Sequence, residues 1–184
     1  VEDAIALLAY LARLDARPLD GIAERPDGPA RIARFLDTPE AKGRFEQEAK
    51  VLRQLLASDA GFYVIDARDP VLAKHRDELL ILGACGRPLL PVLNFVADPG
   101  SQSDTWRDTL SRLGLHAVVE FDAVAPARGG ERRLYSRLAS LLDDAAEARI
   151  DQWLDDVAVR RRTQRQAAAR VIADLLIDVA AMRV

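Results

Sequence analysis

The segment Gly61–Val96 reads GFYVIDARDPVLAKHRDELLILGACGRPLLPVLNFV and has a short apolar run at each end. These two runs, Gly61–Ala67 and Leu89–Val96, are nearly continuous and rich in Val, Phe, Ile and Tyr, which is typical of strands buried on both faces. Between them, Pro70–Gly86 has helical periodicity and is long enough for a crossover connection. The order strand, helix, strand predicts a right-handed parallel unit.

The same alternation continues toward the C-terminus. Residues 101–114, SQSDTWRDTLSRLG, have helical periodicity, and His116–Val124, HAVVEFDAV, is a third apolar run that predicts a strand. A further helix is predicted in residues 131–145, ERRLYSRLASLLDDA. We therefore predict an α/β fold in three layers, with a parallel sheet covered by helices on both faces.

The flanking regions have helical patterns and contain no convincing strand before residue 60. Residues 2–21 predict a short amphipathic helix with the apolar positions Ile5, Leu7, Leu8, Leu11 and Leu14. Residues 45–58 predict a helix that buries Phe45, Ala49, Leu52 and Leu56. From about residue 145 to the end we expect one or two long helices. This predicts an α/β domain over residues 1–145, with its core in 45–145, and a helical extension over 146–184.

The first predicted strand, Gly61–Ala67, is too apolar for an exposed sheet edge. A flat hydrophobic edge strand would template aggregation unless something covered or paired with it. We therefore expect missing neighbours, which could be residues upstream of Val1, a partner chain or helices folded over the edge.

Composition excludes some classes of protein. With 26 basic and 29 acidic side chains the net charge is -3, so the chain has no overall field that would attract nucleic acid or an anionic membrane. Cys85 is the only cysteine, which excludes an internal disulfide. No run of residues is long and apolar enough to span a membrane, and no secretory signal pattern opens the sequence. We expect a cytoplasmic protein, and leave membrane association open for a longer one.

A ligand site is predicted beyond the carboxyl ends of the strands, where open parallel sheets bind their ligands. The loops after the second and third strands offer Asn94, Asp98 and the small-residue turn Val124–Ala127. A short side chain and backbone amides would let a flat heterocycle approach closely. The alternative is that Asn94 and Asp98 only form the turns of their own loop.

Catalytic residues are not evident. The phosphate-binding loop Gly-x-x-x-x-Gly-Lys-Ser/Thr is absent, which excludes self-contained nucleoside triphosphate hydrolysis. Asp37-Thr38-Pro39 is interpreted as a helix cap. His75 and His116 are too far apart in sequence to suggest a metal site, and Cys85 is interpreted as a small core residue. We predict no catalytic and no metal-binding residue.

A local basic cluster lies in the last helical segment, at Arg160, Arg161, Arg162 and Arg165. Such a cluster could make weak contact with RNA or an anionic lipid surface. Because acidic residues flank it at Asp155, Asp156 and Asp174, the simpler interpretation is a solvated helix face.

The stretch SDAGFYVIDARDPVLAKHRDELLILGACGRPLLPVLNFVAD, residues 58–98, resembles the Era-like branch of bacterial GTPases, in which a strand ending in Val-Asp-Ala-Arg precedes a helix and the guanine-specificity strand. The sequences WRDTLSRLGLHAVVEFDAVAP and GERRLYSRLASLLDD are similar to proteobacterial members that carry a C-terminal domain of unknown function. The resemblance covers about residues 45–145. It implies the C-terminal part of a P-loop GTPase-like fold whose first strands and phosphate loop lie before Val1.

The resemblance also implies roles for individual residues. Asn94 would hold the position of the specificity asparagine, with Phe95 where most GTPases have lysine. Ala125 and Pro126 would belong to the loop whose backbone amide faces the guanine oxygen. The sequence departs from the motif at Ala97, where a base-reading aspartate is expected, unless Asp98 serves one residue later.

Two functions follow as expectations. As part of a longer protein the chain would bind GTP or GDP with Mg²⁺, hydrolyse GTP and control a partner. Alone it would be inactive. The alternative is a non-catalytic module that docks a protein at its open sheet edge, or RNA through its basic helix.

Overall fold

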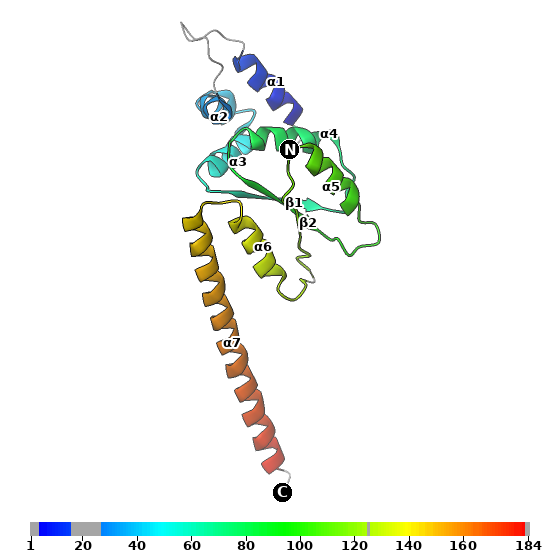
Figure 1. Cartoon of the computed structure of the whole chain (residues 1–184), viewed down its shortest axis with the longest axis vertical. Helices are drawn as coiled ribbons and strands as arrows, with labels where there is room; N and C mark the ends of the chain where they lie inside the picture. The colour runs from blue at the N-terminus through cyan, green and yellow to red at the C-terminus, as the bar shows by residue number, and fades with distance from the viewer. Residues whose placement is uncertain (1–3, 16–26, 125, 183–184) are drawn as a thin grey trace. The chain divides into compact units, whose positions relative to one another are not determined.

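The computed structural model describes residues 4–15, 27–124 and 126–182, which form two compact units, residues 1–142 and 143–184 (Figure 1). The first unit contains a parallel sheet with helices on both faces, and the second is a single long helix. The predicted α/β class, parallel sheet and helical C-terminal extension are confirmed.

The sheet has three parallel strands in the order β1-β2-β3, with β1 at Gly61–Asp66, β2 at Leu89–Asn94 and β3 at Val119–Glu120. β1 and β2 pair over six residues, so that the last residue of one, Asp66, lies beside the last of the other, Asn94. Their polar ends therefore meet at one edge of the sheet.

β3 is much shorter than the predicted strand His116–Val124. It pairs with β2 only through Val92–Val119 and Leu93–Glu120. Beyond Phe121, two backbone N–H groups are taken by side chains instead of a neighbouring strand, because Ala123 donates to Asn94 and Val124 donates to Asp122. The side-chain bonds end the ladder and turn the last part of the apolar run into a loop.

Helices cover both faces of the sheet. On one face, α4 (Ala73–Gly83) and α5 (Ser103–Arg112) contribute to a buried cluster of Ile65, Ala67, Leu79, Leu93, Trp106 and Leu110. On the other face, α6 (Gly130–Ala139) places Leu134 against Leu90 and Val92. All residues of β2 except Asn94 are buried, as its continuous apolar sequence predicts.

The N-terminal helices build a second core. They are α1 (Ala4–Asp15), α2 (Gly28–Leu36), the 3₁₀ turn η1 (Glu40–Lys42) and α3 (Glu46–Leu56). Their core includes Leu7, Ile32, Phe35, Phe45, Leu52 and the predicted core cysteine, Cys85. Helix α2 was not predicted from the sequence. Its start is marked by Asp27, an N-cap that accepts from the N–H of Ala30, and by Pro29 in the first turn.

Three details of the predicted helices need correction. In α1, Ala4 is buried and Ile5 is 63% exposed, so Ile5 lies outside the apolar face assigned to it. In α3, Leu55 is buried, whereas Leu56 is only partly buried. The predicted cap at Asp37-Thr38-Pro39 begins a 3₁₀ turn, in which Thr38 Oγ1 accepts from the N–H of Ala41 at 3.4 Å.

β1 lies at one end of the sheet, and no strand in the described ranges pairs with its outer side. Phe62 is 41% exposed and Val64 is 64% exposed, although the ring of Tyr135 packs edge-on against Phe62. The sequence predicts that something covers this strand. The part of the chain that the structure describes supplies only part of that cover.

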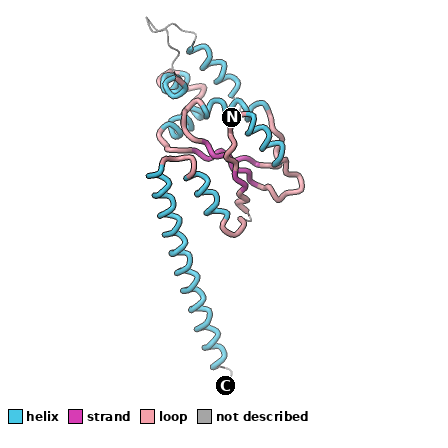
Figure 2. The backbone as a smooth tube through the Cα atoms, in the orientation of Figure 1, coloured by secondary structure: helices cyan, strands magenta, loops and turns pink. Residues whose placement is uncertain are grey.

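The second unit contains α7, a single helix from Asp144 to Ala181 (Figure 2). Asp143 caps it by accepting from the N–H of Ala146 at 2.8 Å. At 1.5 Å per residue its 38 residues extend over about 57 Å. Its last three turns expose Val171, Ile172, Leu175, Leu176 and Val179. Among the described helices, none is long and apolar enough to cross a membrane.

The start of α4 makes a testable pH-dependent contact. His75 Nδ1 accepts a hydrogen bond from the N–H of Leu72 at 3.2 Å, and burial lowers the pKa of His75, a shift that the nearby carboxylates of Glu78 and Asp69 partly offset. A histidine whose pKa is lower in the folded than in the unfolded state contributes fully to stability only above its unfolded pKa of about 6.5. This contribution to stability is lost as the pH falls below that value.

We therefore expect the thermal midpoint to fall as the pH drops below about 6.5. In His75→Gln the decrease should be smaller, because glutamine at this position can accept the same bond and does not titrate. Thermal unfolding followed by circular dichroism across this pH range tests the prediction. His116→Gln, at an exposed histidine, is the matched control. Identical pH profiles for wild type and His75→Gln would refute the role of His75.

Candidate functional site

The loops that follow the three strands are tied to one another by backbone hydrogen bonds. Ala67 donates to the carbonyl of Asn94 at 3.0 Å, and Gln102 donates to the carbonyl of Ala67 at 2.7 Å. Phe121 donates to the carbonyl of Leu93 at 3.0 Å. The carboxyl edge of the sheet is therefore one connected surface formed by three loops, as expected for a ligand site in an open parallel sheet.

Asn94 is the side chain that joins two of these loops. Its Oδ1 accepts from the N–H of Phe95 and from the N–H of Ala123, both at 3.0 Å. One oxygen thus fixes the start of the loop after β2 and the middle of the loop after β3. No hydrogen bond within the described part of the chain uses its amide NH₂ group, which leaves two donors for a ligand.

Phe95 adopts a backbone conformation that is uncommon for a bulky residue. Its φ is 58°, in the left-handed region. The guanidinium of Arg68 covers its ring, with Cζ 3.9 Å from the ring centroid. The structure therefore brings together the loop after β1 and the predicted site residue Phe95.

Arg68 is itself fixed by Asp66 at the end of β1. Its Nε donates to Oδ1 of Asp66 at 2.9 Å and its Nη2 donates to Oδ2 at 2.6 Å. These hydrogen bonds lower the pKa of the Asp66 carboxyl and raise the pKa of Arg68. The two-point contact holds the guanidinium plane in one orientation.

Asp98 forms a turn within its own loop. Its Oδ1 accepts from the N–H of Gly100 at 2.8 Å, and its backbone N–H donates to the carbonyl of Phe95. The side chain is exposed, as is Ala97 before it. Asp98 therefore forms the turn of its own loop, as in the alternative to a ligand-binding role.

The other two predicted base-binding residues lie in the loop after β3. Pro126 is exposed. Ala125 lies outside the described residues. The adjoining Val124 is 78% exposed and donates its N–H to Oδ1 of Asp122 at 3.0 Å.

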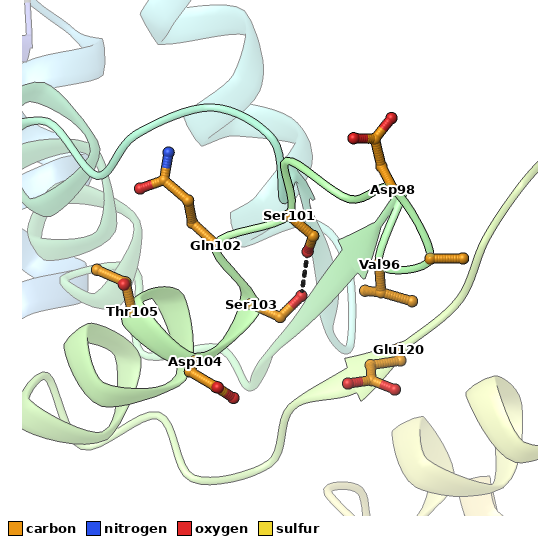
Figure 3. Close-up of a pocket in the computed structure, with 9 residues that line it drawn as sticks. Val96, Asp98, Ser101, Gln102, Ser103, Asp104, Thr105 and Glu120 are labelled. Atoms are coloured by element: carbon orange, nitrogen blue, oxygen red, sulfur yellow. Dashed lines mark hydrogen bonds between the residues drawn. The ribbon is translucent and has the colours of Figure 1, made fainter.

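An open hollow of about 520 Å³ lies beside these loops, between the turn after β2, the start of α5 and β3 (Figure 3). Neither Asn94 nor Phe95 lines it. It contains the carboxylates of Asp98, Asp104 and Glu120 and a contact of 2.6 Å between the hydroxyls of Ser101 and Ser103. Because its charged side chains are acidic, the hollow is unsuited to the phosphates of a nucleotide.

The residues considered for other chemistry are held by structural contacts. Cys85 is buried in the N-terminal core, and burial raises its pKa to about 11, so its thiol is a poor nucleophile at neutral pH. The ring of His75 packs against Trp106. Among the described residues, no group of three or more His, Cys, Asp or Glu side chains is arranged to hold a metal ion.

Comparison with known protein families gives a match in the C-terminal part of the chain. Residues 107–184 match the family described as Domain of unknown function (DUF3482). The DUF3482 match starts within α5 and includes β3, α6 and α7, so that it contains Pro126 but not Asn94, Phe95 or Asp98. No curated protein and no solved structure matches the chain.

Asp66 and Arg68 were expected at the carboxyl end of the first strand but without a binding role, and Gln102 was not predicted, although all three shape the carboxyl edge of the sheet. One feature of the sequence indicates the contact between Asp66 and Arg68. An aspartate that ends an apolar strand, followed two residues later by arginine, can form a local ion pair. The stacking of Arg68 on Phe95 depends on strand register and could not be recognised from spacing alone.

Proposed function

We propose that this chain is the C-terminal part of a GTP-binding and GTP-hydrolysing regulatory protein of the Era-like type, and that it retains the base-binding side of the site. The observation that carries the proposal is the position of Asn94. It ends a buried central strand, and its side-chain oxygen Oδ1 accepts from backbone N–H groups in the loops after β2 and β3. These hydrogen bonds are the ones expected of a specificity asparagine, which holds the loops around a base in place.

Two further observations support the proposal. β1 is an apolar strand without a described partner on its outer side, which suits a sheet that continues with the phosphate-loop strand. The match of residues 107–184 to a domain of unknown function also fits the subgroup that the sequence resembles. A cytoplasmic location is part of this proposal, since the one cysteine is a free thiol.

The chain alone should bind guanine nucleotides weakly and should not hydrolyse GTP. Most of the affinity for a triphosphate comes from a phosphate loop and Mg²⁺, and the sequence contains no such loop. Ala97 offers no carboxylate to the guanine base, so the preference for guanine over adenine should be modest.

A titration with fluorescent GDP and ADP analogues in Mg²⁺ tests the proposal. We expect weak binding with a preference for GDP. Asn94→Ala should remove that preference, because it deletes the acceptor that joins the two loops and the NH₂ donors. Asn94→Asp is the matched variant, because it keeps the acceptor oxygen and replaces the NH₂ donors with a negatively charged oxygen.

Two results would count against the proposal. Equal binding of GDP and ADP by the wild-type chain, or no binding of either, would remove the evidence for a guanine site. A coding sequence without Gly-x-x-x-x-Gly-Lys-Ser/Thr upstream of Val1 would exclude the GTPase itself.

The second candidate is a non-catalytic interaction module. It is favoured by the unpaired outer side of β1, with Val64 64% exposed, which could accept a strand from a partner protein. The exposed arginines of α7, Arg160, Arg161, Arg162 and Arg165, could contribute weak contacts to RNA or a membrane surface. Absence of nucleotide binding, together with a native start near Val1, would favour this candidate.

A further inference from the structure

Arg68 presents a planar cation that is already oriented. One face of its guanidinium lies on the Phe95 ring at 3.9 Å, and one edge is held by two hydrogen bonds to Asp66. The side chain nevertheless remains 45% exposed. A flat ligand could therefore approach this group without breaking either contact.

The strain at Phe95 also points to a ligand. A bulky residue with φ of 58° is unfavourable and persists only where its surroundings enforce it, and such residues cluster at ligand sites. Three described contacts fix Phe95 in place: Asn94 Oδ1 accepts its N–H, its carbonyl accepts from the N–H of Asp98, and Arg68 covers its ring. Within the described part of the chain, Phe95 belongs to neither hydrophobic cluster of the sheet, so packing in these clusters does not account for its conformation.

We propose that Arg68, stacked on Phe95 and fixed by Asp66, is a binding platform for the planar ring of a purine base. The base stacks on the open face of the guanidinium. Arginine suits this role because its guanidinium is planar, delocalised and weakly hydrated, and stacks readily on aromatic faces. The proposal rests on the proposed function for the location of the base, but it takes the affinity from stacking rather than from hydrogen bonds.

The charges around Arg68 favour a ring over an anion. Asp66, Asp69 and Asp98 all lie close enough to raise its pKa through their negative charge. A phosphate placed on Arg68 would meet these carboxylates, whereas the uncharged face of a purine would not. Because every base has a π-face, the platform should accept adenine and guanine alike.

The experiment is an NMR titration of the chain with AMP, GMP, adenosine and inorganic phosphate, each taken into the millimolar range. We expect saturable shifts of the Arg68 and Phe95 amide signals with AMP, GMP and adenosine. Phosphate alone should not produce them. Saturation by phosphate with the same shifts, or no saturable shift with any purine, would overturn the proposal.

Substitutions at Arg68 test whether the binding comes from stacking of the base on its guanidinium. Arg68→Ala should weaken the binding of AMP and of GMP by about tenfold or more, and by the same factor for both. Arg68→Lys should lose as much affinity, because lysine keeps the positive charge but lacks the planar guanidinium on which a base stacks. Arg107→Ala is the matched control, because Arg107 forms a similar exposed ion pair at 2.5 Å with Glu120. Unchanged affinity in Arg68→Ala, in a chain whose amide spectrum is otherwise intact, would refute the platform.

The two proposals can fail separately. If Asn94→Ala removes a guanine preference and Arg68→Ala changes nothing, the guanine site stands and the platform fails. If both purines bind equally and Arg68→Ala weakens both, the platform stands and the guanine site fails.

Discussion

Trp106→Ala should lower the free energy of unfolding by about 3–5 kcal/mol, the range seen when a large buried aromatic side chain is removed. Trp106 is 1% exposed and packs with Ile65, Leu79, Leu93 and Leu110 between the sheet and its helices. Its Nε1 donates to the carbonyl of Asp69 at 2.9 Å, so the substitution also leaves a polar group without its partner. Because a domain is stable by only about 5–15 kcal/mol, this loss is a large part of the total.

Urea denaturation followed by circular dichroism measures this effect, since the substitution removes a fluorophore. Trp153→Ala is the matched control, because Trp153 is 40% exposed and its loss should cost much less. Trp106→Phe should lie between the two, because it keeps most of the buried surface and loses the hydrogen bond. A cost below about 1 kcal/mol for Trp106→Ala would contradict the packing described for this face.

Gly28→Ala should destabilise the chain by about 1–3 kcal/mol, the usual cost of overpacking. A Cβ at Gly28 would lie 2.5 Å from the carbonyl oxygen of Ala84 and 3.2 Å from its Cα. These are backbone atoms at the end of α4 and cannot rotate away, so α2 would have to move. The gain in helix propensity from replacing glycine is at most about 1 kcal/mol and does not offset the clash.

Gly83→Ala is the matched control, because Gly83 directly precedes Ala84 in the sequence. A Cβ at Gly83 would meet nothing within 4 Å, and the residue lies in the last turn of α4. We therefore expect this substitution to stabilise the chain by about 0.5–1 kcal/mol. Urea denaturation of both variants should give shifts of opposite sign. A stabilising effect of Gly28→Ala would show that α2 does not pack against the end of α4.

The sheet was the part of the fold best predicted from the sequence, because a strand buried on both faces must be apolar throughout. β2 follows this pattern from Leu89 to Leu93 and ends at Asn94. β3 was predicted too long for a related reason. Apolar residues from Ala117 to Phe121 do pack beneath the sheet, but hydrogen bonds to Asn94 and Asp122 replace the strand ladder, and periodicity does not report on such bonds.

The candidate site was only partly predictable. Asn94 could be found because it interrupts an apolar run, and its position at a strand end indicates a ligand edge. The partners of Asn94 and Phe95 could not be found, since Ala123 and Arg68 come from other loops and reach them only through the register of the sheet. For the same reason the sequence left open whether Asp98 faced a ligand or closed its own turn.

The order of the strands has a consequence for how the chain folds during synthesis. Because β1, β2 and β3 lie side by side in the order in which they are made, each new strand can dock on the one before it as the polypeptide leaves the ribosome. Growth then proceeds in one direction, away from β1. Within the described ranges no strand occupies the outer side of β1, so that side stays open to pairing throughout these steps.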